Sequence, residues 1–238
     1  TIDPEIVVQA LQDKKELKTS QPSPEAFMQA FQEQLKTYDE VLCMTLSKTL
    51  SGTLNSANLA LTIAENEKVA VVDSETTING GSYLTEKMLE FFDEGHSLKE
   101  GLKLLEDLKS KGSLVFTVDN LQTLVRNGRI GRVSAIIGNI MKVKPILRFK
   151  RGVLELEHKV RSFANVILYL VKEAEKLLPF GKVIVRIGYV DQSAKAKELE
   201  HEMFQLGENV QVSIEGVISP VVSAHVGLGG LGVYLAYE

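Results

Sequence analysis

Two short runs of apolar residues constrain the fold more than any other feature of the chain. They are "VLCMTL" at 41–46 and "KVAVVDS" at 68–74, and a segment with helical spacing of its apolar residues lies between them. Their apolar residues are consecutive rather than alternating, which is typical of strands that are covered on both faces in a parallel sheet. The order helix, strand, helix, strand, helix, helix over residues 1–110 therefore predicts an α/β domain.

The rest of the chain continues with strands and helices in a different order. We interpret "KSKGS" at 109–113 as the boundary between two domains, 1–111 and 112–238. A strand at 114–118, a helix at 119–128, a further helix within 128–141 and a β-hairpin at 144–160 are expected next. Helices at 162–178 and 193–206 then alternate with strands at 182–190 and 210–218, and a short helix and a glycine turn precede a last strand.

The composition argues against several classes of protein. The net charge is −4, the chain has no Trp, and no basic stretch alternates with aromatic residues, so nucleic-acid binding is not expected. No apolar run reaches the roughly 18 residues of a membrane-spanning helix, and no signal peptide opens the chain. The single cysteine, Cys43, cannot form an intramolecular disulfide, which fits a soluble protein of the reducing cytoplasm. No histidines have metal-ligand spacing, so we expect no metal.

The corner after the first apolar strand, "SKTLSGT" at 47–53, concentrates small polar residues. Ligands gather where parallel strands end and helices begin, because a helix N-terminus presents unpaired N–H groups. Ser51 and Thr53 could donate hydroxyl hydrogens to an anion, and Gly52 would let the anion approach the backbone. Alternatively, Ser51 or Thr53 only caps the helix that follows. The corner is not a P-loop, because the first Gly and the Lys of that motif are absent.

The loop "TSQPSP" at 19–24 offers a second set of hydroxyl groups. It places Thr19 and Ser20 ahead of a helix, and its two prolines stiffen the backbone, which suits the presentation of hydroxyls at fixed positions. The same residues also fit a plain turn followed by the N-cap of that helix. Both interpretations stay open from the residues alone.

Two basic side chains complete the candidates. Arg129, in "RNGRIGR" at 126–132, could pair with a carboxylate or a phosphate. Alternatively, the arginines complement the dipole of a helix that ends at Gly128. His225 stands before a glycine-rich turn, which would let a ligand come close to the imidazole.

A hydrolase or acyltransferase is an alternative from a different class. Ser51, His225 and Asp73 could be combined into a nucleophilic triad. The G-x-S-x-G elbow that presents such a serine is absent, because the residues around Ser51 read Thr-Leu-Ser-Gly-Thr. A binding protein for another anion, such as a phosphorylated metabolite, is a third possibility.

Taken in order, the segments "KTSQPSP", "LSKTLSGTLNSA", "VVDSETT", "LVRNGRI", "KVKPIL", "KVR" and "VVSAHVGLGGLGV" resemble the DegV family. The resemblance is strongest to the members that are fatty-acid-binding subunits of bacterial fatty-acid kinase, and it covers nearly the whole chain. The family usually begins with a strand carrying an Asp-Ser pair and then a second strand. Because this chain opens on a helix, we expect a first strand to be missing from it. Many members also read His-Thr-Gly-Pro-Gly where this chain has His-Val-Gly-Leu-Gly at 225–229, which removes one hydroxyl donor.

The resemblance implies a two-domain α/β fold, with a parallel, Rossmann-like sheet covered by helices in the first domain and a mixed sheet in the second. It also implies that a long-chain fatty acid, rather than a cofactor, occupies an apolar tunnel. A separate ATP-dependent kinase subunit would phosphorylate the carboxylate, and the acyl phosphate would feed phospholipid synthesis. The binding protein itself would make no bond. The residues expected to hold the carboxylate are Thr19, Ser20, Ser51, Gly52, Thr53, Arg129 and His225.

The tunnel lining is harder to assign. Apolar residues near the corners are candidates, although plain core packing explains each of them as well: Leu50, Leu54, Ile137, Ile140 and Met141.

Overall fold

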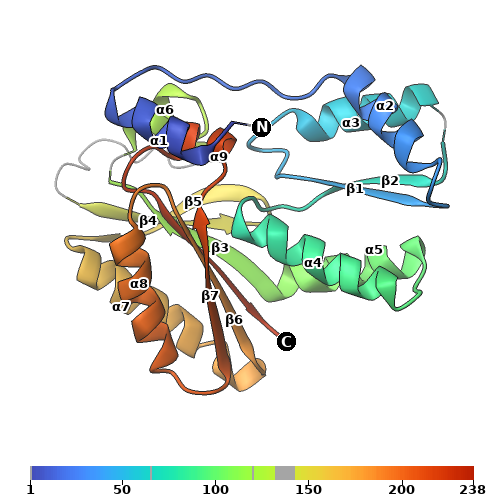
Figure 1. The fold of residues 1–238 in the computed structure, drawn as a ribbon. Coiled ribbons are helices and arrows are strands. Elements are labelled where there is room, and N and C mark those ends of the chain that lie inside the picture. Colours follow the sequence, from blue (N-terminus) through green and yellow to red (C-terminus); the bar gives the residue numbers. More distant parts are fainter. Residues whose placement is uncertain (1, 65, 120, 132–142) are drawn as a thin grey trace.

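The computed structural model describes residues 2–64, 66–119, 121–131 and 143–238 (Figure 1). Strands β1 (Val41–Thr45) and β2 (Val69–Asp73) form a two-stranded parallel sheet, with Val41 opposite Val69 and Thr45 opposite Asp73. The parallel pairing predicted from the two apolar runs is therefore confirmed.

Helices lie on both sides of this small sheet. Helices α2 (Pro24–Gln34) and α3 (Thr53–Ala64) pack together on one side, and α4 (Asn79–Asp93) and α5 (Leu98–Lys111) lie on the other (Figure 1). Ala57 and Ala60 of α3 are fully buried, and their small side chains let the helix approach the sheet closely. Leu42, Met44 and Val72 point the opposite way and pack against the main core of the molecule.

The second sheet has six strands in the order β5-β4-β3-β8-β6-β7. Among the described registers of this second sheet, only the pairing of β6 with β7 is parallel, so the sheet is mixed, as predicted. Its strands are β3 (Gly112–Thr117), β4 (Lys144–Lys150), β5 (Val153–Val160), β6 (Val183–Tyr189), β7 (Val210–Val217) and β8 (Leu231–Tyr237).

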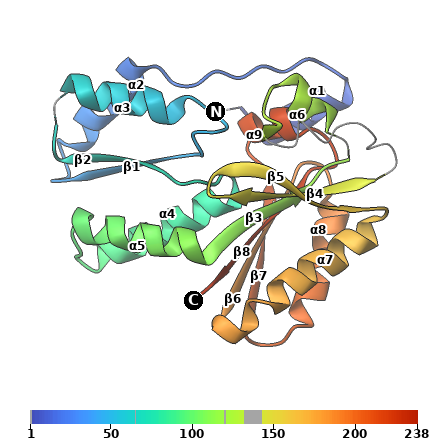
Figure 2. The same cartoon turned by 180° about the vertical axis from the view of Figure 1, so that it is seen from behind.

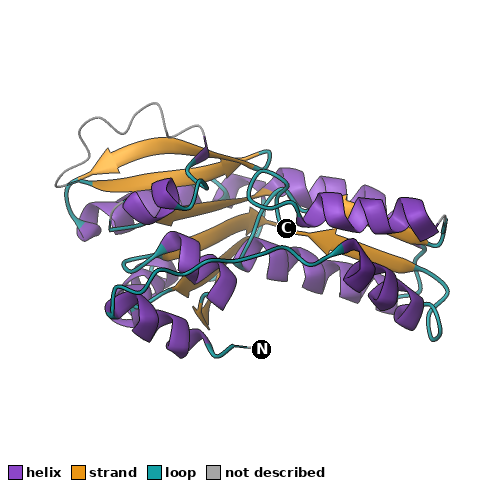
Figure 3. Cartoon of the chain, turned by 90° about the horizontal axis from the view of Figure 1, so that it is seen from above, coloured by secondary structure: helices purple, strands orange, loops and turns teal. Residues whose placement is uncertain are grey.

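The two faces of this sheet are covered by different elements. Helices α7 (Phe163–Glu175) and α8 (Ser193–Phe204) cover one face, and a 3-10 turn, η2 (Leu178–Phe180), follows α7 (Figures 1 and 2). Helices α4 and α5 pack against the other face, which also faces the first sheet. The helices and the strands form layers when the molecule is viewed from above (Figure 3).

Three short helices gather at one end of the second sheet. Helix α1 (Pro4–Gln12) packs on α9 (Pro220–Val226), and α6 (Gln122–Arg126) also contacts α9. The extended segment between α1 and α2 then runs across the top of the molecule to the first sheet (Figure 1). This crossing segment contains the loop at 19–24 with Thr19, so the loop lies on the path from the end of the second sheet to the first sheet.

The junction near residue 111 is tighter than a linker. Helix α5 ends at Lys111 and β3 begins at Gly112 with no loop between them. A Cβ atom at position 112 would lie 2.1 Å from the hydroxyl oxygen of Tyr234, so only glycine fits there. The division into domains 1–111 and 112–238 stays a prediction.

Two predicted helices, at 119–128 and within 128–141, have different outcomes. Helix α6 is shorter than the predicted 119–128, and Gly128 follows it with a left-handed φ of 68°. The helix predicted within 128–141 and the tunnel candidates Ile137, Ile140 and Met141 fall mostly or wholly on 132–142, outside the described residues. In the described part of the chain, no helix combines the length and the apolar character needed to cross a bilayer.

Candidate functional site

A cavity of about 450 Å³ lies between the corner after β1, the crossing loop, the second sheet and α9. Its polar lining residues are Thr19, Ser20, Gln21, Ser51, Thr53, Thr77, Arg129, Ser219 and His225. Its apolar lining residues are Pro22, Leu46, Leu50, Ile78, Leu114, Phe116, Leu124, Phe149, Leu154, Val221, Val222 and Val226. Six of the seven predicted site residues therefore face one space, and Leu50 lines it too, whereas Gly52 and Leu54 are not among the described lining residues.

Thr19 and His225 are in direct contact in this cavity. The Oγ1 atom of Thr19 lies 2.7 Å from Nε2 of His225, within hydrogen-bond distance. The other ring nitrogen, Nδ1, is buried and has no hydrogen-bond partner among the described residues. Burial, and then the positive charge of Arg129, hold the pKa of His225 below its ordinary value. The imidazole is therefore neutral at pH 7.

Arg129 is fixed by two backbone carbonyl groups. Its Nε donates to the carbonyl oxygen of Leu50 at 3.1 Å, and its Nη1 donates to that of Asn127 at 2.7 Å. The chain reaches this position because Gly128 takes the left-handed conformation directly after α6. Both interpretations of "RNGRIGR" therefore apply to this turn: Gly128 ends the helix, and the next residue, Arg129, faces the cavity. The arginine links this turn to the corner that contains Ser51.

Ser51 and Thr53 open α3. The Oγ of Ser51 accepts the backbone N–H of Thr53 at 3.2 Å, and the two hydroxyl oxygens are 2.7 Å apart. Both residues line the cavity while they shape the first turn of the helix. Capping and cavity lining are therefore combined in the same two residues.

The absence of a side chain at Gly52 leaves room for Gln21, a residue that the sequence analysis did not single out. A Cβ atom at position 52 would lie 2.0 Å from Oε1 of Gln21, so the missing side chain leaves room for that glutamine. Gln21 also donates from Nε2 to the hydroxyl of Ser56 at 2.8 Å, which ties the crossing loop to α3. Its place between Ser20 and Pro22, in the loop already singled out, is the one signal that could have found it.

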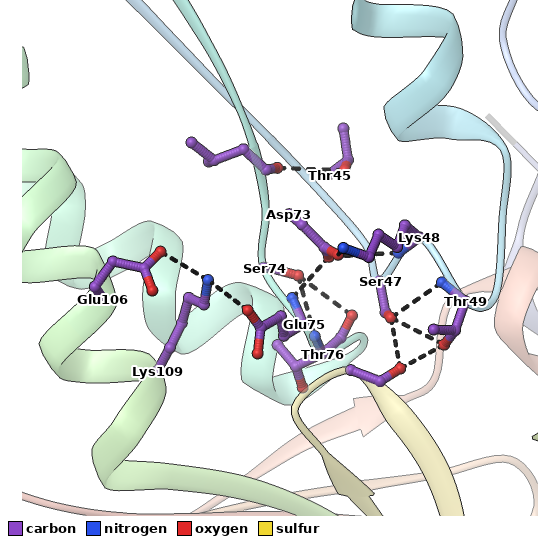
Figure 4. Close-up of polar contacts among 12 residues, drawn as sticks. Thr45, Ser47, Lys48, Thr49, Asp73, Ser74, Glu75, Thr76, Glu106 and Lys109 are labelled. Carbon is purple, nitrogen blue, oxygen red and sulfur yellow. Dashed lines mark hydrogen bonds and ion pairs between the residues drawn. The ribbon is translucent and has the colours of Figure 1, made fainter.

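The other half of the polar corner has a structural role. The hydroxyl of Ser47, which is fully buried, donates to the carbonyl oxygen of Gly152 at 2.7 Å, and the hydroxyl of Thr49 donates to the same oxygen (Figure 4). Gly152 is in the turn of the β4–β5 hairpin with a φ of 77°, within the hairpin that the sequence predicted at 144–160. Ser47 and Thr49 thus hold the hairpin against the first sheet.

Asp73 is not among the described residues that line the cavity with Ser51 and His225. Its Oδ1 accepts the N–H of Glu75 at 2.9 Å and that of Lys48 at 3.4 Å (Figure 4). The described hydrogen bonds of Ser51 and His225 go to Thr53 and Thr19. This geometry does not assemble a Ser-His-Asp relay. Among the described residues, no three His, Cys, Asp or Glu side chains come together in a way that could hold a metal ion.

Comparison with known proteins identifies the family. The family model described as "Uncharacterised protein, DegV family" matches residues 1–238. A DegV domain-containing protein of Staphylococcus aureus (strain MRSA252) is 31% identical over 236 residues, which are 98% of this chain and 83% of the relative.

Two solved structures of DegV family proteins have a similar fold. A DegV family protein from Thermus thermophilus, described as binding fatty acid, has a TM-score of 0.92 at 29% identity and covers 100% of this chain and 85% of its own. DegV from Bacillus subtilis, described as a fatty acid binding protein, has a TM-score of 0.84 at 27% identity, with 97% and 82% covered. With a family match over its whole length and a relative aligned along nearly all of it, this chain belongs to the DegV family.

Proposed function

We propose that this protein binds one long-chain fatty acid in the cavity and presents its carboxylate to an ATP-dependent fatty-acid kinase subunit. The observation that carries the proposal is one space of about 450 Å³ that combines a wall of aliphatic and aromatic side chains with hydroxyl, imidazole and guanidinium groups from separate loops. The T. thermophilus and B. subtilis proteins described as binding fatty acid support this class of ligand.

The cavity has the volume that such a ligand needs. An engineered protein cavity of about 150 Å³ accommodates benzene, so a carbon atom with its hydrogens takes about 25 Å³. On that scale, about 450 Å³ has room for about 18 carbon atoms. Burial of a methylene contributes about 0.8 kcal/mol, so about 14 methylenes contribute on the order of 10 kcal/mol before the cost of ordering the chain.

The carboxylate needs donors that replace its water. If Nε2 of His225 carries the ring proton and donates to Thr19, the hydroxyl hydrogen of Thr19 is free to point at the ligand. The hydroxyl of Ser51 is a second donor at the start of α3, whose partial positive charge favours an anion. Arg129 supplies the cationic charge, and its two carbonyl partners hold it in place.

The polar end of the cavity is also the accessible end. Ser20, Gln21 and Pro22 line the cavity and are exposed at the surface. A carboxylate beside them is shielded on the chain side but reachable by a second protein. We therefore assign the bond-making step to the kinase and only binding and orientation to this chain.

The direct test is mass spectrometry of the denatured, purified chain, followed by titration of the delipidated protein with palmitate and oleate. We expect a co-purified long-chain fatty acid and binding of one molecule per chain. No lipid and no uptake would refute the proposal. Competition by phosphorylated metabolites would favour the anion-binding alternative, and ester hydrolysis lost in Ser51→Ala would favour the hydrolase.

A further inference from the structure

A second, smaller pocket adjoins the cavity. It has a volume of about 60 Å³, and two of its lining residues, Leu114 and Phe149, also line the large cavity. Both side chains are almost completely buried, Leu114 at 0% and Phe149 at 6% exposure. The two spaces are therefore separated by a wall that includes these two side chains. The remaining lining residues of the small pocket are Ser74, Glu75, Thr76, Leu84, Lys109, Gly112, Ser113, Arg151 and Tyr234.

This wall lies further along β3 than the end of the strand next to His225. Strand β8 begins at Leu231, shortly after α9 and His225, and pairs there with Thr117 of β3. Moving along β3 away from that end, Phe116 comes first and Leu114 lies two residues further, opposite Tyr234. Successive residues on one face of a strand are roughly 7 Å apart, so the cavity follows β3 from His225 toward the wall.

The space behind the wall is polar and does not suit a methyl group. The ammonium group of Lys109 lies there with only 9% of its side chain exposed, between Glu75 at 2.9 Å and Glu106 at 2.8 Å (Figure 4). Ser74, Thr76 and Tyr234 border the same pocket. The acyl chain would gain nothing from entering it, because polar groups there would lose water without gaining partners.

We propose that Phe149, supported by Leu114, is the end wall of the acyl-chain cavity and sets the longest chain that this protein accepts. The inference rests on the proposed fatty-acid function and adds which residue determines chain length. By the volume per carbon used above, replacing Phe149 by alanine would free the space that its aromatic ring fills, which is room for several carbon atoms before the acyl chain would reach the polar pocket.

The test measures dissociation constants of the full chain for saturated fatty acids from dodecanoate to eicosanoate, in steps of two carbons. For the wild type, affinity should rise about fourfold per methylene up to a limiting length and then fall. In Phe149→Ala the limit should move up by at least one step of the series. Phe149→Leu keeps a larger apolar side chain in the core, so it should show a smaller shift of the limiting length. It replaces the alanine variant in the test if that variant does not fold.

The matched control is Phe116→Ala. Phe116 lies on the same sheet face, is buried to a similar extent and stacks on Phe149 with ring centroids 6.2 Å apart, but it lines only the large cavity. This variant should lower affinity for all chains without moving the limit. Equal shifts in both alanine variants, or none in either Phe149 variant, would overturn the inference while leaving fatty-acid binding intact.

A fatty acid with a terminal hydroxyl group gives an independent measurement. Wild-type protein and Phe116→Ala should bind 16-hydroxyhexadecanoate at least about tenfold more weakly than palmitate, because the hydroxyl would be buried against an apolar wall. Phe149→Ala should lose most of this discrimination, because the hydroxyl reaches the polar pocket. Undiminished discrimination in Phe149→Ala would contradict the proposal. If the wild type binds no fatty acid of any length, the proposed function itself fails.

Discussion

Thr19 Oγ1 and His225 Nε2 are 2.7 Å apart although 206 positions separate the two residues in the chain. The contact joins the segment that crosses between the sheets to helix α9 near the C-terminus. It also brings together a hydroxyl group and a neutral imidazole whose Nδ1 is buried without a described partner. The pair is therefore a suitable place to test how the carboxylate is held.

Replacing Thr19 by valine should weaken fatty-acid binding about tenfold or more, because a hydrogen bond to a charged group contributes about 1.5–3 kcal/mol. The shape of the side chain is retained, so the free energy of unfolding should change little. Isothermal titration with palmitate measures the effect. Thr19→Ser keeps the hydroxyl and should bind nearly as well as the wild type; equal losses in both variants would show that packing, and not the hydroxyl, matters.

The ligand-free protein should lose stability as the pH falls through the ordinary pKa of histidine. Burial, and then Arg129, lower the pKa of His225 from 6.5, so the unfolded chain binds this proton more readily than the folded chain. The contribution of neutral His225 to the free energy of unfolding is fully present above the unfolded-state pKa. It is lost as the pH drops from there toward the folded-state pKa. Urea unfolding between about pH 5 and 8 should therefore show a steeper acid loss in the wild type than in His225→Gln. Parallel curves would rule out this role for His225.

Ser51→Ala should reduce acyl-phosphate formation by a partner kinase more than it reduces lipid uptake. The acyl chain supplies most of the binding energy, whereas the hydroxyl orients the carboxylate for attack. Fatty-acid titration and a coupled kinase assay on the same preparation separate the two effects. If both fall by the same factor, Ser51 contributes to binding alone.

Ser47→Ala should destabilise the fold by about 0.5–1.5 kcal/mol, because the carbonyl of Gly152 loses one of its two hydroxyl donors while Thr49 still bonds it. Urea unfolding with an unchanged m-value measures this loss. Thr62→Ala is the control, since its hydroxyl bonds an exposed helical carbonyl, that of Asn58. A loss in Ser47→Ala no larger than in the control would contradict the role of Ser47 in holding the hairpin.

Local patterns predicted much of this fold. The consecutive apolar residues of β1 and β2 were sufficient to predict parallel pairing, and the Ser23-Pro24 start of α2 was readable because the serine caps its helix. The limits of α6 were not predictable in the same way. Its polar residues fit a helix or a loop equally well, and tertiary packing decides where such a helix ends.

The site was only partly predictable for a related reason. Ser47 and Ser51 are the same residue type in one short corner, and nothing local distinguishes the serine that bonds Gly152 from the serine that lines the cavity. That difference depends on where a hairpin more than 100 residues later comes to lie. The role of Phe149 was hidden in the same way, because a phenylalanine in a strand looks like any core residue until two spaces are seen on either side of it.

The bonds from Ser47 and Thr49 to Gly152 also bear on how cargo is exchanged. They join the small sheet to the hairpin through two hydroxyl groups, so parting the protein along that seam would break both hydrogen bonds. Ser20, Gln21 and Pro22 line the same cavity and face solvent, so we expect the cavity to open more readily on that side. A lipid held as we assign it would therefore leave headgroup first, with its tail drawn out last past the same residues.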